Sequence, residues 1–275
     1  MALVVNTNVQ SLNAQRNLDV NQAGLATVFQ RLSSGLRVNT ARDDAAGLAV
    51  SEGIRAFVNG SNVGIRNAND GISLANTAEA ALGQVTNNLQ RIREIAVQAA
   101  NGTISDTQRT NLSAETAQLA TEITRIIQNT SFNGNQLLSG GSNLVFQIGA
   151  QSGSTDQLTV TAQQLSAVAN NISAGAGLTS SQALASATIG TMDTQLTSVT
   201  TARATFGAVT NRFEAVIANL QVYAESLTAA RGRIIDADFA AETAALTRSQ
   251  ILQQASTSVL AQANALPQNA LTLLR

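Results

Sequence analysis

The sequence of 275 residues contains no cysteine, no histidine, no tryptophan and no lysine. Without His and Cys, it lacks the commonest general base, the thiolate nucleophile and the usual zinc ligands. Because there is no Cys, the redox compartment of the protein cannot be inferred from disulfides. The formal net charge is −1, and the basic residues are all Arg and form no basic block. These absences disfavour an enzyme, a metal or other cofactor, and a nucleic-acid partner.

Proline and aromatic residues are also scarce. The single proline, Pro267, lies near the C-terminus, so no proline interrupts a helix upstream of it. Aromatics make up only 3%, so Ala, Leu, Val and Ile carry most of the 44% hydrophobic fraction. No apolar run approaches about 18 residues, and the N-terminus lacks the pattern of a cleaved secretory signal. We expect long helices packed by small and aliphatic side chains and no membrane partner. If the protein leaves the cell, it does so by a route other than a cleaved signal.

Apolar residues recur every seven positions in two parts of the chain. Six positions in register near the C-terminal side predict a coiled-coil-like helix of about 38 residues. These positions are Met192, Val199, Phe206, Phe213, Leu220 and Leu227. Residues 62–100 repeat the spacing and predict a partner helix, with Leu82, Leu89 and Ile92 on its apolar side. We predict a mostly α fold, a long antiparallel coiled coil or helical bundle.

Three stretches between these helices have a different character. Asn101-Gly102 predicts a helix stop, and Ser105 and Asp106 are candidate caps for the helix that follows. Apolar and polar residues alternate between about 137 and 161, which predicts a small β-hairpin. Residues 162–189 are rich in Ala, Ser, Thr and Gly and predict a short surface connection.

Both ends of the chain carry narrow apolar stripes. Near the N-terminus the stripe consists of Leu18, Leu25 and Leu32, with Phe29 between the last two. Near the C-terminus it consists of Ala245, Leu252, Val259 and Leu266. Helices of this kind are marginal in isolation, because they bury too little area alone. We expect them to pair, either with each other as an intramolecular hairpin or with copies from other subunits.

The charged cluster Arg42, Asp43 and Asp44 raises the question of a metal or acid–base site. On a helix the two Asp side chains would point about 100° apart, so they would not converge on one ion. The next acid, Glu52, lies about two turns further on, which leaves too few oxygen ligands. We interpret Thr40 or Asp43 as a helix cap, with the acids favoured by the helix dipole.

Several long blocks resemble bacterial flagellins, in a fixed order that spans essentially the whole chain. They are NTNVQSLNAQRNL, RLSSGLRVNTARDDAAGLAVSEGIR, LQRIREIAVQAANGT, SFNG at 131–134, and RIIDADFAAETAALTRSQILQQASTSVLAQANALPQNALTLLR. Flagellins usually insert variable outer domains before the long C-terminal helix. The span 162–189 is too short for them, so the resemblance implies a short form without these domains.

The resemblance also implies a domain organisation. Residues 1–34 plus 240–275 correspond to an inner coiled-coil domain that lines the filament channel, is disordered in the free monomer and folds on assembly. Residues 35–57 correspond to a connector, and residues 58–161 plus 190–235 to a helical outer-core domain. In the connector, small residues permit close packing and polar side chains contact other subunits, through Arg42, Asp43, Asp44 and Gly47.

The partners follow from the same resemblance. We expect copies of the chain in a helical homopolymer, a filament cap, junction proteins, and a chaperone for type III export to the extracellular flagellum. LQRIREIAVQ resembles the segment that a mammalian Toll-like receptor recognises, on a surface also expected to be buried between subunits. The matching positions are Gln90, Arg91, Ile95 (where many recognised flagellins have Leu) and Glu115.

Three hypotheses about function result from this sequence. The leading one is a structural, non-enzymatic subunit that self-assembles into the flagellar filament used for motility. The alternative is a hook–filament junction protein, which shares the terminal patterns but caps a filament instead of extending it. The third, an enzyme with a site in a helical bundle, is disfavoured by the missing His and Cys.

Overall fold

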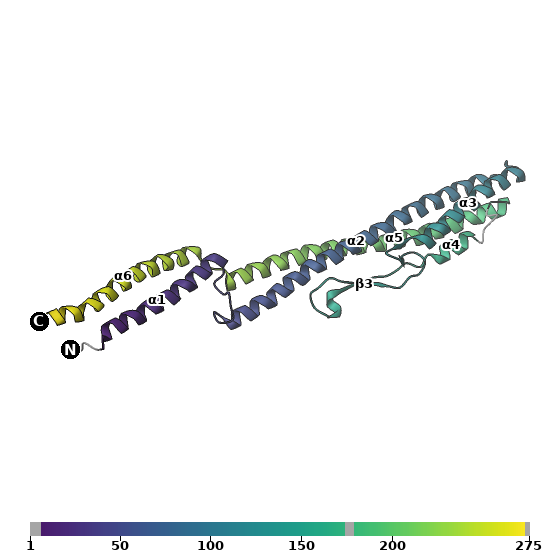
Figure 1. Ribbon diagram of the computed structural model, residues 1–275. Coiled ribbons are helices and arrows are strands. Elements are labelled where there is room, and N and C mark those ends of the chain that lie inside the picture. Colours follow the sequence, from purple (N-terminus) through teal and green to yellow (C-terminus); the bar gives the residue numbers. More distant parts are fainter. Residues whose placement is uncertain (1–6, 174–178, 273–275) are drawn as a thin grey trace. The chain divides into compact units, whose positions relative to one another are not determined.

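The computed structural model confirms the predicted fold class, a mostly α chain with long antiparallel helices and a small β-hairpin (Figure 1). It describes residues 7–173 and 179–272; the side chains of Ser173 and of residues 266–272 lie outside this description. The described helices are α1 (Val9–Ser34), α2 (Ala45–Ala99), α3 (Asp106–Asn129), α4 (Ser166–Ser173), α5 (Gln182–Ile235) and α6 (Phe239–Thr272). A short 3-10 turn, η1, spans Ser154–Asp156.

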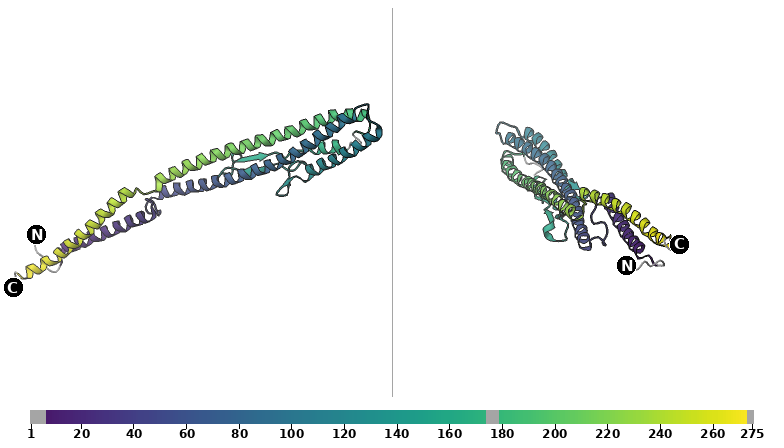
Figure 2. Two further views of the ribbon diagram at one scale, coloured as in Figure 1. Left: turned by 90° about the horizontal axis from the view of Figure 1, so that it is seen from above. Right: turned by 90° about the vertical axis from the view of Figure 1, so that its left-hand side faces the viewer.

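The chain divides into two compact units. The first unit consists of Met1–Ala56 and Ser226–Arg275, and the second of Phe57–Glu225. Within the first unit, α1 and α6 lie side by side and antiparallel, as Figures 1 and 2 both show. The two chain ends are therefore paired with each other in the single chain, the first of the two pairings expected above.

Two small antiparallel sheets lie in the second unit. β3 (Leu144–Gln147) pairs with β4 (Gln157–Val160), within the range predicted for the hairpin. β1 (Ser131–Phe132) and β2 (Asn135–Gln136) form a second, two-residue ladder that the alternation pattern did not predict. Strands of two residues are too short to show an alternation of apolar and polar residues. The local sequence signal for this ladder is the dipeptide Asn133-Gly134, and both of its residues adopt a positive φ in the turn.

Helix α5 is longer than predicted, with 54 residues against about 38. The buried row continues upstream of Met192 through Ala185 and Thr188. These residues keep the seven-residue spacing but are small or polar, so a pattern of large apolar residues did not reveal them. The span 162–189, expected to be a connection with room for a short helix, contains α4 and the start of α5.

The core of the second unit forms where the apolar rows of its helices meet. Most of the residues predicted for this bundle are at most 1% exposed, whereas Leu220 and Leu227 are half-buried. The buried ones are Leu82, Leu89, Ile92, Met192, Val199, Phe206 and Phe213. Phe213 also contacts Phe146 of β3 edge to face, with ring centroids 5.4 Å apart. The hairpin thus closes one side of the same core.

The turn from α2 to α3 depends on a buried arginine that the sequence did not single out. Arg109 is 6% exposed and donates to the carbonyl oxygens of Ala99 at 2.8 Å and Asn101 at 2.9 Å. It thereby satisfies carbonyls at the end of α2 that have no partner within the helix. α2 ends at Ala99, just before the predicted stop, and Ser105 caps α3 in a capping box with Gln108.

Close contact between α2 and α5 requires glycine at one position. A Cβ on Gly71 would collide with the ring of Phe213, which is fully buried and has no free space to move into. Gly83, on the same helix, has no atom within 4 Å of the place where its Cβ would lie. The two glycines therefore serve different purposes, although the sequence gives no way to tell them apart.

We expect Gly71→Ala to destabilise the second unit by about 1–3 kcal/mol, the usual cost of overpacking a core. The matched control Gly83→Ala should leave stability unchanged or raise it by up to about 1 kcal/mol, because Ala favours the helix. Urea unfolding followed by circular dichroism measures both. Equal effects of the two substitutions would contradict the proposed contact.

Candidate assembly surface

The contact between α1 and α6 follows a seven-residue pattern with alternating steps of three and four. We call the less exposed residues on the facing sides of the two helices the inner seam. On α1 they include Ser11, Ala14, Leu18, Asn21, Leu25, Val28, Arg31 and Leu32. On α6 they include Glu242, Leu246, Ser249, Gln253, Ser256, Leu260 and Ala263. The predicted N-terminal stripe of leucines therefore lies in this seam.

Polar contacts hold much of the inner seam together. The Asn21 amide donates to the Ser256 hydroxyl at 3.2 Å, and the Ser11 hydroxyl donates to the Asn264 side chain at 2.7 Å. Arg31 pairs with Glu242 at 3.2 Å, and Glu242 is the only acidic residue of α6. Polar groups at such positions specify alignment at a cost in stability. Polar contacts therefore specify the alignment of the two helices, beside the leucines that share the seam.

Several large apolar residues of α6 lie outside the inner seam, although Leu246 and Leu260 lie within it. Ile251, Leu252 and Val259 are 60%, 43% and 54% exposed, and we call them the outer apolar row. Leu252 and Val259 belong to the C-terminal stripe predicted from the sequence, but they are exposed, whereas Ser249 and Ser256 lie in the seam with α1. α1 also exposes apolar side chains, including Phe29 at 49% and Val20 at 65%. The predicted contact of Leu266 lies outside the described residues.

The segment that follows α1 is joined by backbone hydrogen bonds to the segment that precedes α6. Gly35 ends α1 in the left-handed conformation, with a φ of 71°, and its N–H donates to the Arg31 carbonyl at 2.8 Å. Leu36 forms a β-bridge with Asp236, and the Arg37 N–H donates to the Ile235 carbonyl at 2.6 Å. The segment just after α1 and the segment just before α6 are therefore hydrogen-bonded to each other.

The charged cluster Arg42, Asp43 and Asp44 follows the segment after α1, and one of its residues caps α2. Asp44, not Thr40 or Asp43 as predicted, caps α2: its Oδ1 accepts from the Gly47 N–H at 2.8 Å. A Cβ on Gly47 would collide with that carboxylate, so the glycine makes room for the cap. Arg42 is exposed. The carboxylates of this cluster therefore accept local hydrogen bonds and do not converge as ligands on one ion.

Asp43 organises the turn that precedes Asp44. The backbone N–H and the hydroxyl of Thr40 and the N–H of Asn39 all donate to its Oδ2, at 2.9, 3.0 and 3.2 Å. These hydrogen bonds favour the ionised carboxylate and hold the pKa of Asp43 below its ordinary value. The neighbouring small residues Ala45, Ala46 and Ala49 are exposed, so no part of the chain within the described residues covers them.

The residues expected to form a receptor-like surface on the second unit do not all share one surface. Gln90, Arg91 and Glu115 are exposed, and Arg91 donates to Glu115 at 2.8 Å, which raises the pKa of Arg91. Ile95 is fully buried, so its assignment to this surface was wrong. It lies three residues after Ile92, on the core side of α2, where the apolar spacing of the helix places it.

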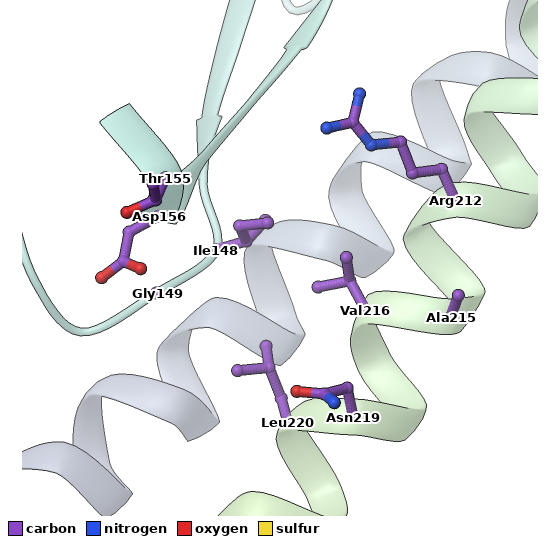
Figure 3. Close-up of a pocket in the computed structure, with 9 residues that line it drawn as sticks. All are labelled: Ile148, Gly149, Thr155, Asp156, Arg212, Ala215, Val216, Asn219 and Leu220. Atoms are coloured by element: carbon purple, nitrogen blue, oxygen red, sulfur yellow. The ribbon is translucent and has the colours of Figure 1, made fainter. Parts of the chain in front are cut away.

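The second unit also has a pocket of about 340 Å³ beside the loop that joins β3 to β4 (Figure 3). Ile148, Val216 and Leu220 form its apolar wall, with Asp156 on the loop and Arg212 on α5. Within residues 7–173 and 179–272 there is no group of three or more His, Cys, Asp or Glu that could hold a metal ion. None of the described helices combines the length and apolar character that a membrane crossing requires.

Two family models match the chain. Residues 5–143 match the bacterial flagellin N-terminal helical region, and residues 189–274 match the C-terminal helical region. The chain belongs to the bacterial flagellin family. The matched regions include α1, α6 and the rows of α2 and α5 that form the core, so the family signature and the paired helices coincide.

Full-length relatives agree with this assignment. A flagellin from Halalkalibacterium halodurans is 43% identical over 274 residues, covering 99% of this chain and 100% of the relative. A flagellin from Bacillus subtilis is 40% identical over 304 residues, covering 98% and 99%. Flagellin B from Vibrio cholerae, 34% identical, aligns over 375 positions and covers 100% of both chains. This chain is thus a short flagellin that lacks the outer domain.

One solved structure shows the same kind of fold. A putative flagellar hook-associated protein from Vibrio parahaemolyticus aligns with a TM-score of 0.57 over 70% of this chain and 100% of its own, at 14% identity. At that identity the likeness shows the fold alone, so it does not favour a junction protein. Bacillus cereus flagellin, 32% identical, covers 56% of this chain and 88% of its own with a TM-score of 0.49.

Membership of the family settles the general function. Flagellins are structural proteins that self-assemble into the extracellular filament of the bacterial flagellum. This chain is accordingly a filament subunit, as predicted. Nothing among the relatives favours the alternative of a hook–filament junction protein.

The lowered pKa of Asp43 predicts that the turn of this flagellin at residues 39–43 loosens in acid. Its stabilising contribution is present above the ordinary Asp pKa of about 3.9 and is lost as the pH falls through the lower, folded value. Hydrogen exchange of the peptide around Thr40 in assembled filaments should therefore rise in that acid range. Asp43→Asn should show fast exchange at every pH; protection independent of pH in the unmodified chain would contradict the assignment.

Proposed function

We propose that the outer apolar row of α6 and the exposed apolar residues of α1 are the surfaces through which this flagellin polymerises. The carrying observation is a row of large apolar side chains that the first unit leaves uncovered. Part of the α6 side of the inner seam is polar, with Ser249, Gln253 and Ser256, whereas Ile251, Leu252 and Val259 are exposed. A hairpin that leaves large apolar residues exposed gains from contact with further copies.

In this proposal, residues 1–34 plus 240–275 form the inner domain that lines the filament channel. Residues 35–57 are the connector, and residues 58–161 plus 190–235 form the outer core, with 162–189 as a surface connection. The exposed Ala45, Ala46 and Ala49 support a tightly packed connector, because their small side chains let another copy approach closely. Arg42 has the exposure needed for a polar contact between subunits.

Burial of apolar area would drive the assembly. Each Å² of apolar surface removed from water contributes about 25 cal/mol, so repeated contacts along a polymer add up. A surface that meets a different surface of the next copy gives an open helix when the rotation does not close. A polar inner seam also leaves the isolated hairpin marginal, which fits a domain that orders only when neighbours cover it.

Further partners rest on the flagellin resemblance. We propose a filament cap, junction proteins and an export chaperone as partners, and no catalytic activity. The monomer would also bind a Toll-like receptor through Gln90, Arg91 and Glu115, of which Arg91 and Glu115 form an ion pair. Ile95 has no part in this surface, because it is buried.

Val259→Asp should abolish elongation of short filament seeds, because a charge on the outer apolar row would have to be buried without a partner. Leu25→Asp should do the same from within the inner seam. Electron microscopy of seeded samples measures elongation, and circular dichroism should show the second unit still folded. Gln254→Asp is the matched control: it adds the same charge at an exposed α6 position outside that row.

A chain without residues 1–34 and 241–275 should remain a folded monomer under the same conditions. Long filaments from Val259→Asp, or from the shortened chain, would refute the proposed surface. Short capped rings from the intact chain would instead support a junction protein.

Arg91→Ala should weaken activation of receptor-reporter cells by the monomer, because it removes the exposed cation and frees Glu115. Arg125→Ala is the matched control, since Arg125 is similarly exposed and pairs only with Glu122 on its own helix. Equal responses to both variants would argue against a role for Arg91.

A further inference from the structure

Three Asn-Gly pairs occur in the chain, and the structure holds them in three different ways. Asn-Gly is the dipeptide most open to spontaneous deamidation, because glycine has no side chain to shield its backbone nitrogen. That nitrogen attacks the Asn Cγ, a C–N bond forms, and the side-chain amide leaves as ammonia. Water then opens the five-membered imide to aspartate or isoaspartate. The reaction needs a Gly N–H free of the backbone ladder and an Asn Cγ beside it.

Two of the pairs are held in geometries that oppose this attack. Asn59-Gly60 lies inside α2, where the helical hydrogen bonds occupy the backbone N–H groups and fix the peptide. Asn133-Gly134 forms the tight turn between β1 and β2, with φ values of 49° and 81°. The ladder on both sides of that turn resists the rotation that would carry the glycine nitrogen to the Asn Cγ.

The third pair, Asn101-Gly102, is arranged for the reaction. It follows the end of α2, both residues are exposed, and the Asn101 Oδ1 accepts from the Thr103 N–H at 3.2 Å. This hydrogen bond folds the Asn101 side chain back over the intervening Gly102 nitrogen. The same N–H also lies where negative charge develops on Oδ1 during the attack, so it stabilises the tetrahedral intermediate.

We propose that Asn101 is a site of spontaneous deamidation in this protein and that the change is transmitted to a buried arginine. The Asn101 carbonyl accepts from the Arg109 guanidinium at 2.9 Å, and Arg109 is 6% exposed. In isoaspartate at position 101 the chain runs through Cβ and Cγ, one carbon longer, and the main-chain carbonyl that Arg109 contacts becomes a free carboxylate, so the link to Gly102 has to rearrange. The new carboxylate also lies at the C-terminal end of α2, where the helix dipole disfavours negative charge. Deamidation therefore loosens the α2–α3 turn.

The test is to incubate the full-length protein in warm, mildly alkaline buffer and to quantify aspartate and isoaspartate by peptide mass spectrometry. Asn101 should convert about tenfold faster than Asn133, a factor that corresponds to about 1.4 kcal/mol of activation barrier. Asn59 should be the slowest. Gly102→Ala should suppress conversion at Asn101 by a similar factor while leaving Asn133 unchanged. The added methyl has room, because Nε2 of Gln182, the nearest atom of the described residues, would lie 3.9 Å from its Cβ.

Hydrogen exchange of the first turn of α3 provides the second measurement. Exchange there should rise in the aged protein and not in aged Gly102→Ala, while Asn101→Asp separates the effect of charge from that of the longer backbone. Equal conversion of Asn101 and Asn133, or no suppression by Gly102→Ala, would overturn the assignment of the site. Unchanged exchange in α3 of fully converted protein would overturn the link to Arg109.

Discussion

The packing of α2 against α5 in the second unit is the interaction on which the rest of this flagellin depends. Both helices present apolar residues every seven positions, and these rows supply most of the fully buried side chains. Gly71 lets Phe213 approach the α2 backbone, and Phe213 in turn contacts Phe146 of the hairpin. Because interiors are close-packed, this one contact positions both long helices and the sheet that covers them.

The first unit is packed differently from the apolar core of the second. Its two helices meet along an inner seam in which leucines alternate with serine, asparagine, glutamine and one ion pair, while further large apolar side chains remain exposed. The polar positions of such a seam specify how two helices align at a cost in stability. The division is consistent with a protein whose second unit is stable alone and whose first unit is completed by neighbouring copies.

Charged residues in this chain act mainly as local structural elements. Asp44 caps α2, Asp43 closes the preceding turn, and Arg109 satisfies carbonyls at the far end of the same helix. Pairs such as Arg203 with Glu79, 2.6 Å apart, join α5 to α2. Exposed pairs of this kind contribute about 0–1 kcal/mol each, so they align helices that apolar burial has already brought together.

The sequence by itself determined the fold class, the long helices and the family. Seven-residue spacing predicts helices that must pack on one another, and ordered blocks such as RLSSGLRVNTARDDAAGLAV identify a flagellin without any coordinates. It also located the end of α2 and the cap at Ser105, because caps and stops are local signals carried by a few adjacent residues.

Only the tertiary structure decided which side of each helix faces which partner. Ser249 and Ser256 are seven residues apart, and so are Leu252 and Val259. Periodicity alone cannot tell which of these two pairs meets α1. Ile95 and Arg91 are four residues apart on one helix, yet one is buried and the other exposed. Gly71 and Gly83 also lie on one helix, yet Phe213 packs against Gly71 and no side chain of the described residues lies against Gly83. Sequence spacing fixes positions along a helix, whereas burial depends on what another segment, far away in the chain, places against them.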